Sequence, residues 1–217
     1  MRKLLLLILF LTTALANVNG QAVKSVAAVD EWAEIAQNAV REGATTDISG
    51  NYETLLHIDI ALSDATAHNG TKIEVQLSSN TTGDEDWSTF TSFLGPSGTA
   101  NPEAVAGTEA AGSTVIEVAS TTGLYDDDAV RFIFIENSTP ANSEMGLLVS
   151  HAANVSVTLQ DGITNAQTGS TLFDIAKRYT IQLPLSAVRF RVIYDNTYHA
   201  AGATVFTSCR LVKVTSL

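Results

Sequence analysis

The side chains that could do chemistry are few and lie far apart in the sequence. None of the four histidines belongs to a His-Glu-x-x-His pattern, which would place two imidazoles on one metal ion; they are His57, His68, His151 and His199. His57 and Asp59 come closest to a ligand pair, because residues two apart share one face of a strand. We interpret this pair as part of an exposed polar face, and the sequence predicts no metal-binding residue.

Two runs of acidic residues are the remaining candidates for a metal site. They are Asp84-Glu85-Asp86 and Asp126-Asp127-Asp128, and calcium prefers several such oxygen ligands. Neither run has the alternate spacing of a calcium-binding loop, and consecutive side chains on an extended chain point apart. We interpret both runs as solvated loop charge. Bound calcium is the alternative, and no other cofactor is predicted.

Catalytic motifs do not stand out either. The sequence has no Gly-x-Ser-x-Gly nucleophile elbow, and Gly95-Pro96-Ser97-Gly98 is better interpreted as a turn. No glycine-rich phosphate loop links a strand to a helix. A glycosidase needs only two carboxylates at a set separation, which a sequence alone does not exclude. The prediction is a non-enzymatic protein without catalytic or cofactor-binding residues.

Aromatic side chains could instead form a platform for sugar rings. The candidates are Trp32, Tyr52, Trp87, Tyr125 and Tyr198, but aromatic residues make up only 7% of the chain and are scattered along it. Packing in the core is therefore the favoured role for them, since buried rings contribute large apolar area.

The composition and net charge of the chain exclude some classes of binding partner. The chain has 217 residues, of which 45% are hydrophobic, and 12 basic residues stand against 23 acidic ones, for a net charge of −11. Such a chain repels nucleic acid and anionic membrane surfaces, so neither is a predicted partner. Cys209 is the single cysteine, which excludes an internal disulfide, and its apolar surroundings predict a buried thiol.

The N-terminus has the pattern of a secretory signal peptide within residues 1–20. Arg2 and Lys3 precede a short apolar run, and Ala14-Leu15-Ala16 provides a small-residue cleavage site. The run is too short to span a bilayer comfortably, so no membrane span is predicted once it is cleaved, and a retained N-terminal anchor is the alternative. The expected location is extracellular or on a virion surface.

The candidate residues named above must be positioned by β-strands, because apolar and polar residues alternate in many segments of the sequence. In residues 187–196, Val188, Phe190, Val192 and Tyr194 fall on one face and predict a half-buried strand. Residues 31–40 fit either a helix or a strand, and we prefer a strand. Further strands are predicted at 56–61, 73–77, 87–94, 114–119, 129–136, 145–150, 155–159, 179–183 and 204–214. The predicted fold is all-β, an antiparallel β-sandwich or jelly roll.

The domain organisation follows from a break in this pattern. Residues 95–113 hold mostly Ala, Gly, Thr, Pro, Asn and Glu, which is typical of a linker. We predict that residues 100–170 form a small β-barrel-like module, inserted into a sandwich built from residues 21–99 and 171–217. Residues 21–29 are predicted to be an extended lead-in.

Three stretches carry a family resemblance. They are Asp47-Ile48-Ser49-Gly50 with the strand after it, Gly83-Asp84-Glu85-Asp86-Trp87, and residues 111–123. From Trp32 to its end the chain resembles virion-structural β-sandwich proteins of tailed phages and prophages, whose role is often undefined. The resemblance implies a structural role and transfers no catalytic residue. The signal-like N-terminus departs from it, because phage virion proteins are normally made in the cytoplasm.

The function predicted from these observations is structural. The chain is expected to act by self-assembly or by attachment to other structural proteins, as a virion decoration or structural component or as a subunit of an extracellular filament or layer. Arg189, Arg191 and Arg210 are predicted to share an outward face and to pair with a neighbouring subunit, or else within the chain. The alternative function is a secreted module that binds glycans or a cell-surface partner.

Overall fold

The structure is a computed structural model that describes residues 24–83, 86–122, 131–197 and 204–214. Its regular elements in these ranges are β-strands and one short 3-10 helix, η1 (Pro140–Asn142). In chain order the strands are β1 (Lys24–Ile35), β2 (Val40–Glu42), β3 (Thr46–Asp47), β4 (Glu53–Leu62), β5 (Lys72–Ser78), β6 (Ser88–Leu94), β7 (Pro102–Ala104), β8 (Thr108–Glu109), β9 (Val115–Glu117), β10 (Arg131–Glu136), β11 (Glu144–Ala152), β12 (Ser156–Leu159), β13 (Gln167–Thr168), β14 (Thr171–Gln182), β15 (Arg189–Asp195) and β16 (Val205–Val214).

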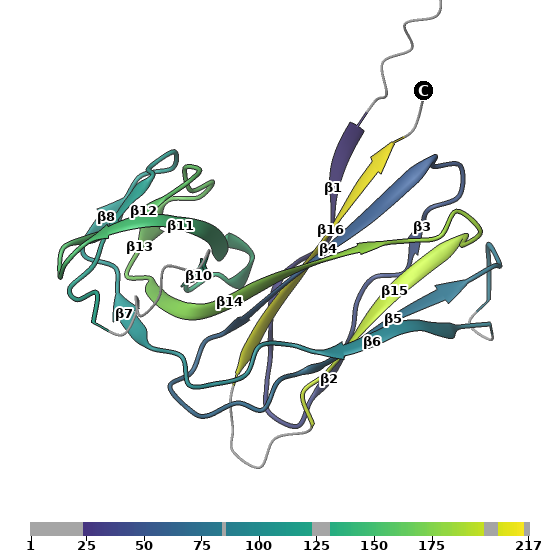
Figure 1. Cartoon of the computed structure of the whole chain (residues 1–217), viewed down its shortest axis with the longest axis horizontal. Coiled ribbons are helices and arrows are strands. Elements are labelled where there is room, and N and C mark those ends of the chain that lie inside the picture. The colour runs from purple at the N-terminus through teal and green to yellow at the C-terminus, as the bar shows by residue number, and fades with distance from the viewer. Residues whose placement is uncertain (1–23, 84–85, 123–130, 198–203, 215–217) are drawn as a thin grey trace, which may run out of the picture.

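The strands form two large antiparallel sheets and one small one, which confirms the predicted all-β class. The first large sheet has the order β1-β16-β4-β14-β10-β11-β12-β9, with β7 also paired to β14. The second has the order β2-β15-β5-β6, with β3 also paired to β15, and β13 pairs with β8 alone. Figure 1 shows the first sheet running from β1 along β14 and curling over into the strands at its far end.

The long strand β14 belongs to both halves of that sheet. Its first residues, 171–176, pair with β7 and β10, and residues 176–182 pair with β4. Buried apolar residues form two clusters along it. One fills the space between the two large sheets, and the other lies within the curled end and draws on residues from Val105 to Leu172. A single strand therefore joins two packed cores.

The core face predicted for residues 187–196 is confirmed within β15, whereas Arg189 of the predicted outward face is buried and donates to the carbonyl of Asn80. Phe190, Val192 and Tyr194 of β15 are buried in the first cluster, which also contains Leu56 and Ile58 of the other large sheet. Cys209 is also fully buried there, as predicted, and burial raises the pKa of its thiol. A neutral, inaccessible thiol acts as a small apolar side chain.

The structure differs in part from the predictions for two segments. The preference for a strand at residues 31–40 is right as far as Ile35, where β1 ends; a turn with Asn38 in the left-handed region (φ 59°) then leads to β2. The interpretation of residues 95–113 as a linker is wrong in part, because β7 and β8 lie within it. Pro102 lacks an N–H group, yet as the first residue of a short outer strand it does not interrupt the pairing of β7 with β14.

The carboxyl of Glu136, at the end of β10, is expected to make the stability of the fold depend on pH. Partial burial, and then the nearby Glu34, raise the pKa of its carboxyl. A carboxyl whose pKa is higher in the folded than in the unfolded state makes stability fall as the pH rises through that window. Glu136→Gln is therefore expected to raise the melting temperature at pH 7, by a change worth less than about 1 kcal/mol at this solvent-screened site. Thermal melts at pH 7 and at about pH 3.5 would check it, because the gain should disappear where both states are protonated.

Candidate functional site

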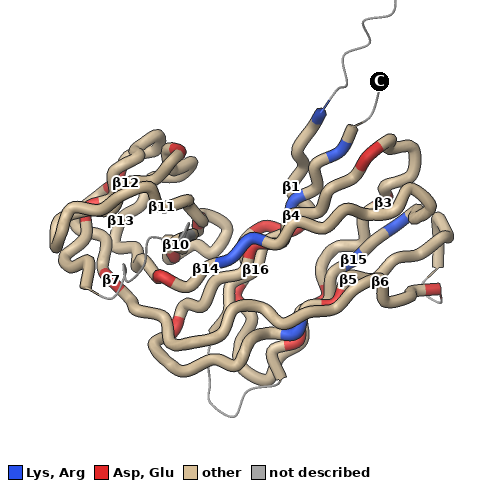
Figure 2. The backbone as a smooth tube through the Cα atoms, viewed as in Figure 1, with Lys and Arg blue, Asp and Glu red and all other residues tan. Residues whose placement is uncertain are grey.

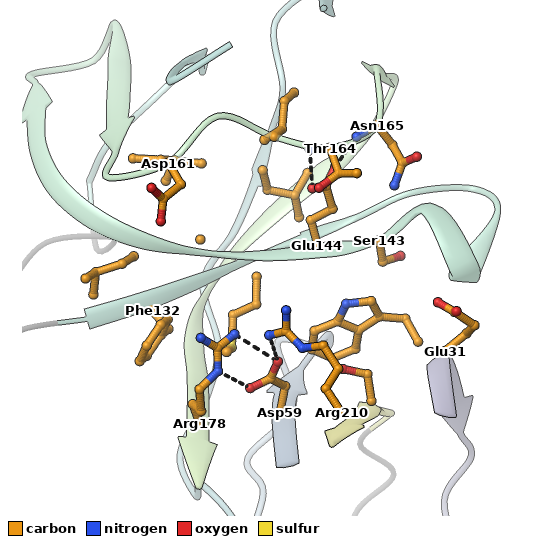
Figure 3. Close-up of a pocket in the computed structure, with 18 of the residues that line it drawn as sticks. Glu31, Asp59, Phe132, Ser143, Glu144, Asp161, Thr164, Asn165, Arg178 and Arg210 are labelled. Atoms are coloured by element: carbon orange, nitrogen blue, oxygen red, sulfur yellow. Dashed lines mark hydrogen bonds and ion pairs between the residues drawn. The ribbon is translucent and has the colours of Figure 1, made fainter. Parts of the chain in front are cut away.

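A cleft of about 470 Å³ lies on the concave side of the curled sheet. One wall is formed by residues of β1, β4, β14 and β16, and the other by β10, β11 and the segment 160–165 (Figure 3). The two walls come from the two ends of one continuous sheet. Curling of that sheet is therefore what makes the cleft.

Asp59 lies in the wall of this cleft because of the alternation along β4. Ile58 and Ile60 point into the sandwich core, so Asp59 points to the opposite face. The sequence predicted an exposed polar face there, and this is wrong for Asp59, whose residue surface is only 2% exposed. The curled end of the sheet covers that face, which a strand pattern alone does not reveal. The carboxylate of Asp59 is contacted there by two arginines.

Arg178 and Arg210 both bind the Asp59 carboxylate. Arg178 is directly opposite Asp59 on β14 and donates twice, from Nε to Oδ1 (2.7 Å) and from Nη2 to Oδ2 (3.0 Å). Arg210 reaches across from β16 and donates from Nη2 to Oδ2 (2.7 Å). Figure 2 shows basic and acidic positions meeting where β4, β14 and β16 lie side by side. The two guanidinium groups exceed the Asp59 carboxylate by one positive charge, and Asp30 and Glu31 of β1 place further carboxylates on the same wall.

The two arginine side chains differ in how much of their surface is buried by the rest of the protein. The Arg178 side chain is 27% exposed and also lies 5.2 Å from the ring centre of Phe132, whereas that of Arg210 is 42% exposed. Burial and these two cations lower the pKa of the neighbouring His57, burial being the largest cause. His57 is therefore a neutral imidazole at neutral pH. Arg210 is the cation with most surface open to the cleft.

Carboxylates also line the cleft, with Glu144 and Asp161 on the opposite wall and Glu31 of β1 on the same wall as the arginines. Glu144 of β11 accepts hydrogen bonds from the backbone N–H groups of Thr164 (2.5 Å) and Asn165 (2.7 Å) and thereby fixes the segment 160–165. Glu31 and Asp161 are exposed and make no hydrogen bond or ion pair with any residue that the structure describes. Their carboxylates are available at the edge of the cleft (Figure 3).

An aromatic contact connects the lining of the cleft to the buried core. Trp32 of β1 lines it and packs against Phe134 of β10 with ring centres 4.8 Å apart, and Phe134 packs against Phe206 of β16 at 5.1 Å. The described aromatic residues of the predicted platform do not come together. Trp87 lies beside Arg189 and Arg191, Tyr52 is exposed before β4, and Tyr125 and Tyr198 lie outside the described residues.

The arginines predicted to share one face are split between two sheets. Arg189 and Arg191 lie on β15 and flank Trp87, while Arg210 faces the cleft. Arg191 donates to Glu42 (2.6 Å), so the alternative of pairing within the chain is right for this residue. The shared-face prediction failed because β15 and β16 alternate correctly but belong to different sheets.

The remaining metal-site candidates lie apart from one another or outside the described residues. His68 is buried, lies 3.1 Å from the side-chain oxygen of Asn196 through its Nε2, and accepts the Gly70 N–H at its Nδ1. His151 is exposed on β11, and His199 lies outside the described residues. The same holds for Asp84, Glu85 and the run 126–128. Within the described ranges no three His, Cys, Asp or Glu residues cluster as metal ligands. No helix there is long and apolar enough to cross a bilayer.

Comparison with known proteins adds little. The sequence matches no protein-family model and no curated protein. Two viral structures show a low similarity. The infectious bursal disease virus VP2 subviral particle has a TM-score of 0.22 and 7% identity, over 91% of this chain and 42% of that one. VP17, a capsid protein of bacteriophage P23-77, has a TM-score of 0.17 and 9% identity, over 89% of this chain and 98% of that one. Similarity at this level supports no conclusion about fold or function.

Proposed function

We propose that this protein is a non-enzymatic structural subunit that self-associates through the open edge of β1. The observation that carries the proposal is that β1 is the terminal strand of the large sheet and pairs with β16 alone (Figure 1). Along residues 24–29 its other edge makes no hydrogen bond with any residue in the described part of the chain. An unpaired edge is a template for adding a strand from another molecule.

Only a short part of this edge has regular strand geometry. The pairing of β1 with β16 is regular from Lys24 to Ala28 and becomes irregular between Ala28 and Asp30 and again between Asp30 and Ala33. Irregularities of this kind discourage strand addition, so association is confined to the first half of β1. Val26 lies in that half and is 66% exposed, which is unusual for a valine on a sheet. A second copy that pairs there covers it.

The surroundings and location of the subunit are part of the same proposal. Residues 1–20 act as a cleaved signal peptide, and residues 100–170 protrude as a module from the sandwich of residues 21–99 and 171–217. The separate cluster of buried apolar residues between Val105 and Leu172 supports this division. The assembly is an extracellular layer or filament, or a virion surface to which the subunit attaches.

The test replaces one side chain on the proposed interface. Val26→Lys puts a charge in the middle of the edge, and we expect it to shift the protein from higher-order particles to monomers, because lysine on an edge strand opposes pairing. Deletion of residues 21–29 is a poorer test, since Lys24–Ala28 also cover the edge of β16. Light scattering after size-exclusion chromatography, together with negative-stain microscopy, would measure the change.

A matched control separates the edge from general surface charge. Val149 on β11 is also exposed (57%), and Val149→Lys is expected to assemble like the unmodified protein. Equal assembly by both variants would count against the proposal, as would an unmodified protein that stays monomeric at high concentration.

A further inference from the structure

The cleft presents both hydrogen-bond donors and hydrogen-bond acceptors to a ligand. Arg178 and Arg210 make three hydrogen bonds to Asp59, while two guanidinium groups together carry about ten N–H donors. Glu31, on β1 of the same wall, and Asp161, on the opposite wall, are exposed carboxylates without a partner among the described residues. A ligand in the cleft therefore meets both kinds of group.

This arrangement selects against simple ions. A small anion accepted by Arg210 also meets the like charges of Glu31, Glu144 and Asp161, which line the same cleft. A cation accepted by those carboxylates meets the two guanidinium groups in the same way. Hydroxyl groups avoid this conflict, because each one donates one hydrogen bond and accepts up to two without carrying a charge.

Shape and apolar surface favour a ring-shaped ligand. A volume of about 470 Å³ lies within the range of sites for drug-sized ligands, roughly 300–1,000 Å³, and a short oligosaccharide has a similar size. Trp32, Phe132 and Leu147 also line the cleft and supply apolar surface against which the C–H faces of sugar rings can pack.

From these observations we infer that the cleft is a binding site for a neutral, hydroxyl-rich ligand, a short uncharged oligosaccharide. Arg210 and Arg178 donate to ligand oxygens, Glu31 and Asp161 accept from ligand hydroxyls, and Asp59 holds the two guanidinium groups in place. The site goes beyond the assembly proposal, because its polar groups lie outside the regular first half of β1.

The test titrates the full chain with trisaccharides of glucose, N-acetylglucosamine and xylose, up to ~10 mM so that millimolar affinities are detected. Trisaccharides of galacturonic acid and of glucosamine serve as the acidic and cationic comparators. We expect saturable binding of at least one neutral trisaccharide by calorimetry. Arg210→Met should weaken it about tenfold or more, because charged hydrogen-bond donors are lost while the apolar stem remains.

Three further variants test which side chains contribute to binding. Lys177→Met removes the same charge from the neighbouring position of β14, on the opposite face of the sheet, and should leave binding unchanged. Asp161→Ala removes a side chain without described partners, so it should weaken binding severalfold while the melting temperature stays the same. Glu31→Gln removes a charge but keeps an acceptor, and for an uncharged ligand it should change the affinity by less than about threefold.

Three outcomes would overturn the inference. They are no saturable binding of any neutral trisaccharide, tighter binding of the acidic or the cationic trisaccharide than of every neutral one, and equal binding by Arg210→Met and the unmodified protein. Assembly of the same samples would be followed in parallel, because loss of binding with normal particles separates this site from the β1 edge.

Discussion

Replacing Arg178 with methionine is expected to lower the free energy of unfolding by about 3 kcal/mol. The Asp59 residue is 2% exposed and accepts two hydrogen bonds from Arg178, so the substitution leaves a charge in the wall of the cleft with one cationic partner instead of two. Removing one partner of a buried ion pair costs about 3–5 kcal/mol. The lower end applies because Arg210 still binds Oδ2. Chemical denaturation followed by circular dichroism would measure the loss.

Two further variants test the cause of that loss. Arg210→Met should cost less than about 1.5 kcal/mol, because its side chain is 42% exposed and Arg178 keeps both of its hydrogen bonds to Asp59. In the double variant Asp59→Leu/Arg178→Met, both charges are replaced by apolar groups of similar size, and most of the stability should return. A double variant that is less stable than Arg178→Met alone would show that the ion pair is not the source of the effect.

The sequence predicted many of the strands but not their partners, and of β14 it predicted only the end, from residue 179. Alternation of apolar and polar residues marks β4, β5, β15 and β16, because each strand has one face in a core. The pattern does not state which sheet a strand joins, and for that reason Arg210 was grouped with Arg189 and Arg191. Only long-range pairing decides this, and β16 pairs with β1 and β4 while β15 pairs with β5.

The cleft was missed for a related reason. Asp59 was interpreted as exposed because it alternates with Leu56, Ile58 and Ile60, and on a flat open sheet that inference would be correct. The sheet curls instead, and residues more than 70 positions away cover the face. One signal was present in the sequence, namely an acidic residue in a strand whose other members are mostly apolar, since such a residue needs a cationic partner. It did not identify Arg178 or Arg210 as that partner.

The aromatic contact between Trp32, which lines the cleft, and the buried Phe134 joins the two cores. Phe134 lies on β10, whose neighbouring residues Ile133 and Ile135 belong to the core of the curled end. Alternation turns Phe134 the other way, and it packs in the sandwich cluster between Trp32 and Phe206. The two cores should therefore unfold together, because a fully buried side chain of one end completes the core of the other.

Phe134→Ala is accordingly expected to cost about 3–5 kcal/mol, the usual loss for truncating a buried phenylalanine. The side chain is fully buried, and its removal takes away two ring contacts with centres at 4.8 Å and 5.1 Å. Thermal and chemical unfolding, followed by tryptophan fluorescence and by circular dichroism, would measure the loss. Phe134→Leu should recover part of the stability, since it refills most of the cavity.

Phe90 provides the control for this truncation. It lies on the outer strand β6 and is 44% exposed, so Phe90→Ala removes the same atoms at a site that leaves little cavity and should cost less than about 1 kcal/mol. If Phe134→Ala cost no more than Phe90→Ala, the aromatic contact would not be what couples the two ends of the sheet. If the two spectroscopic signals separated in the unmodified protein, the cores would unfold independently, and the cleft between them would not be held rigid by packing.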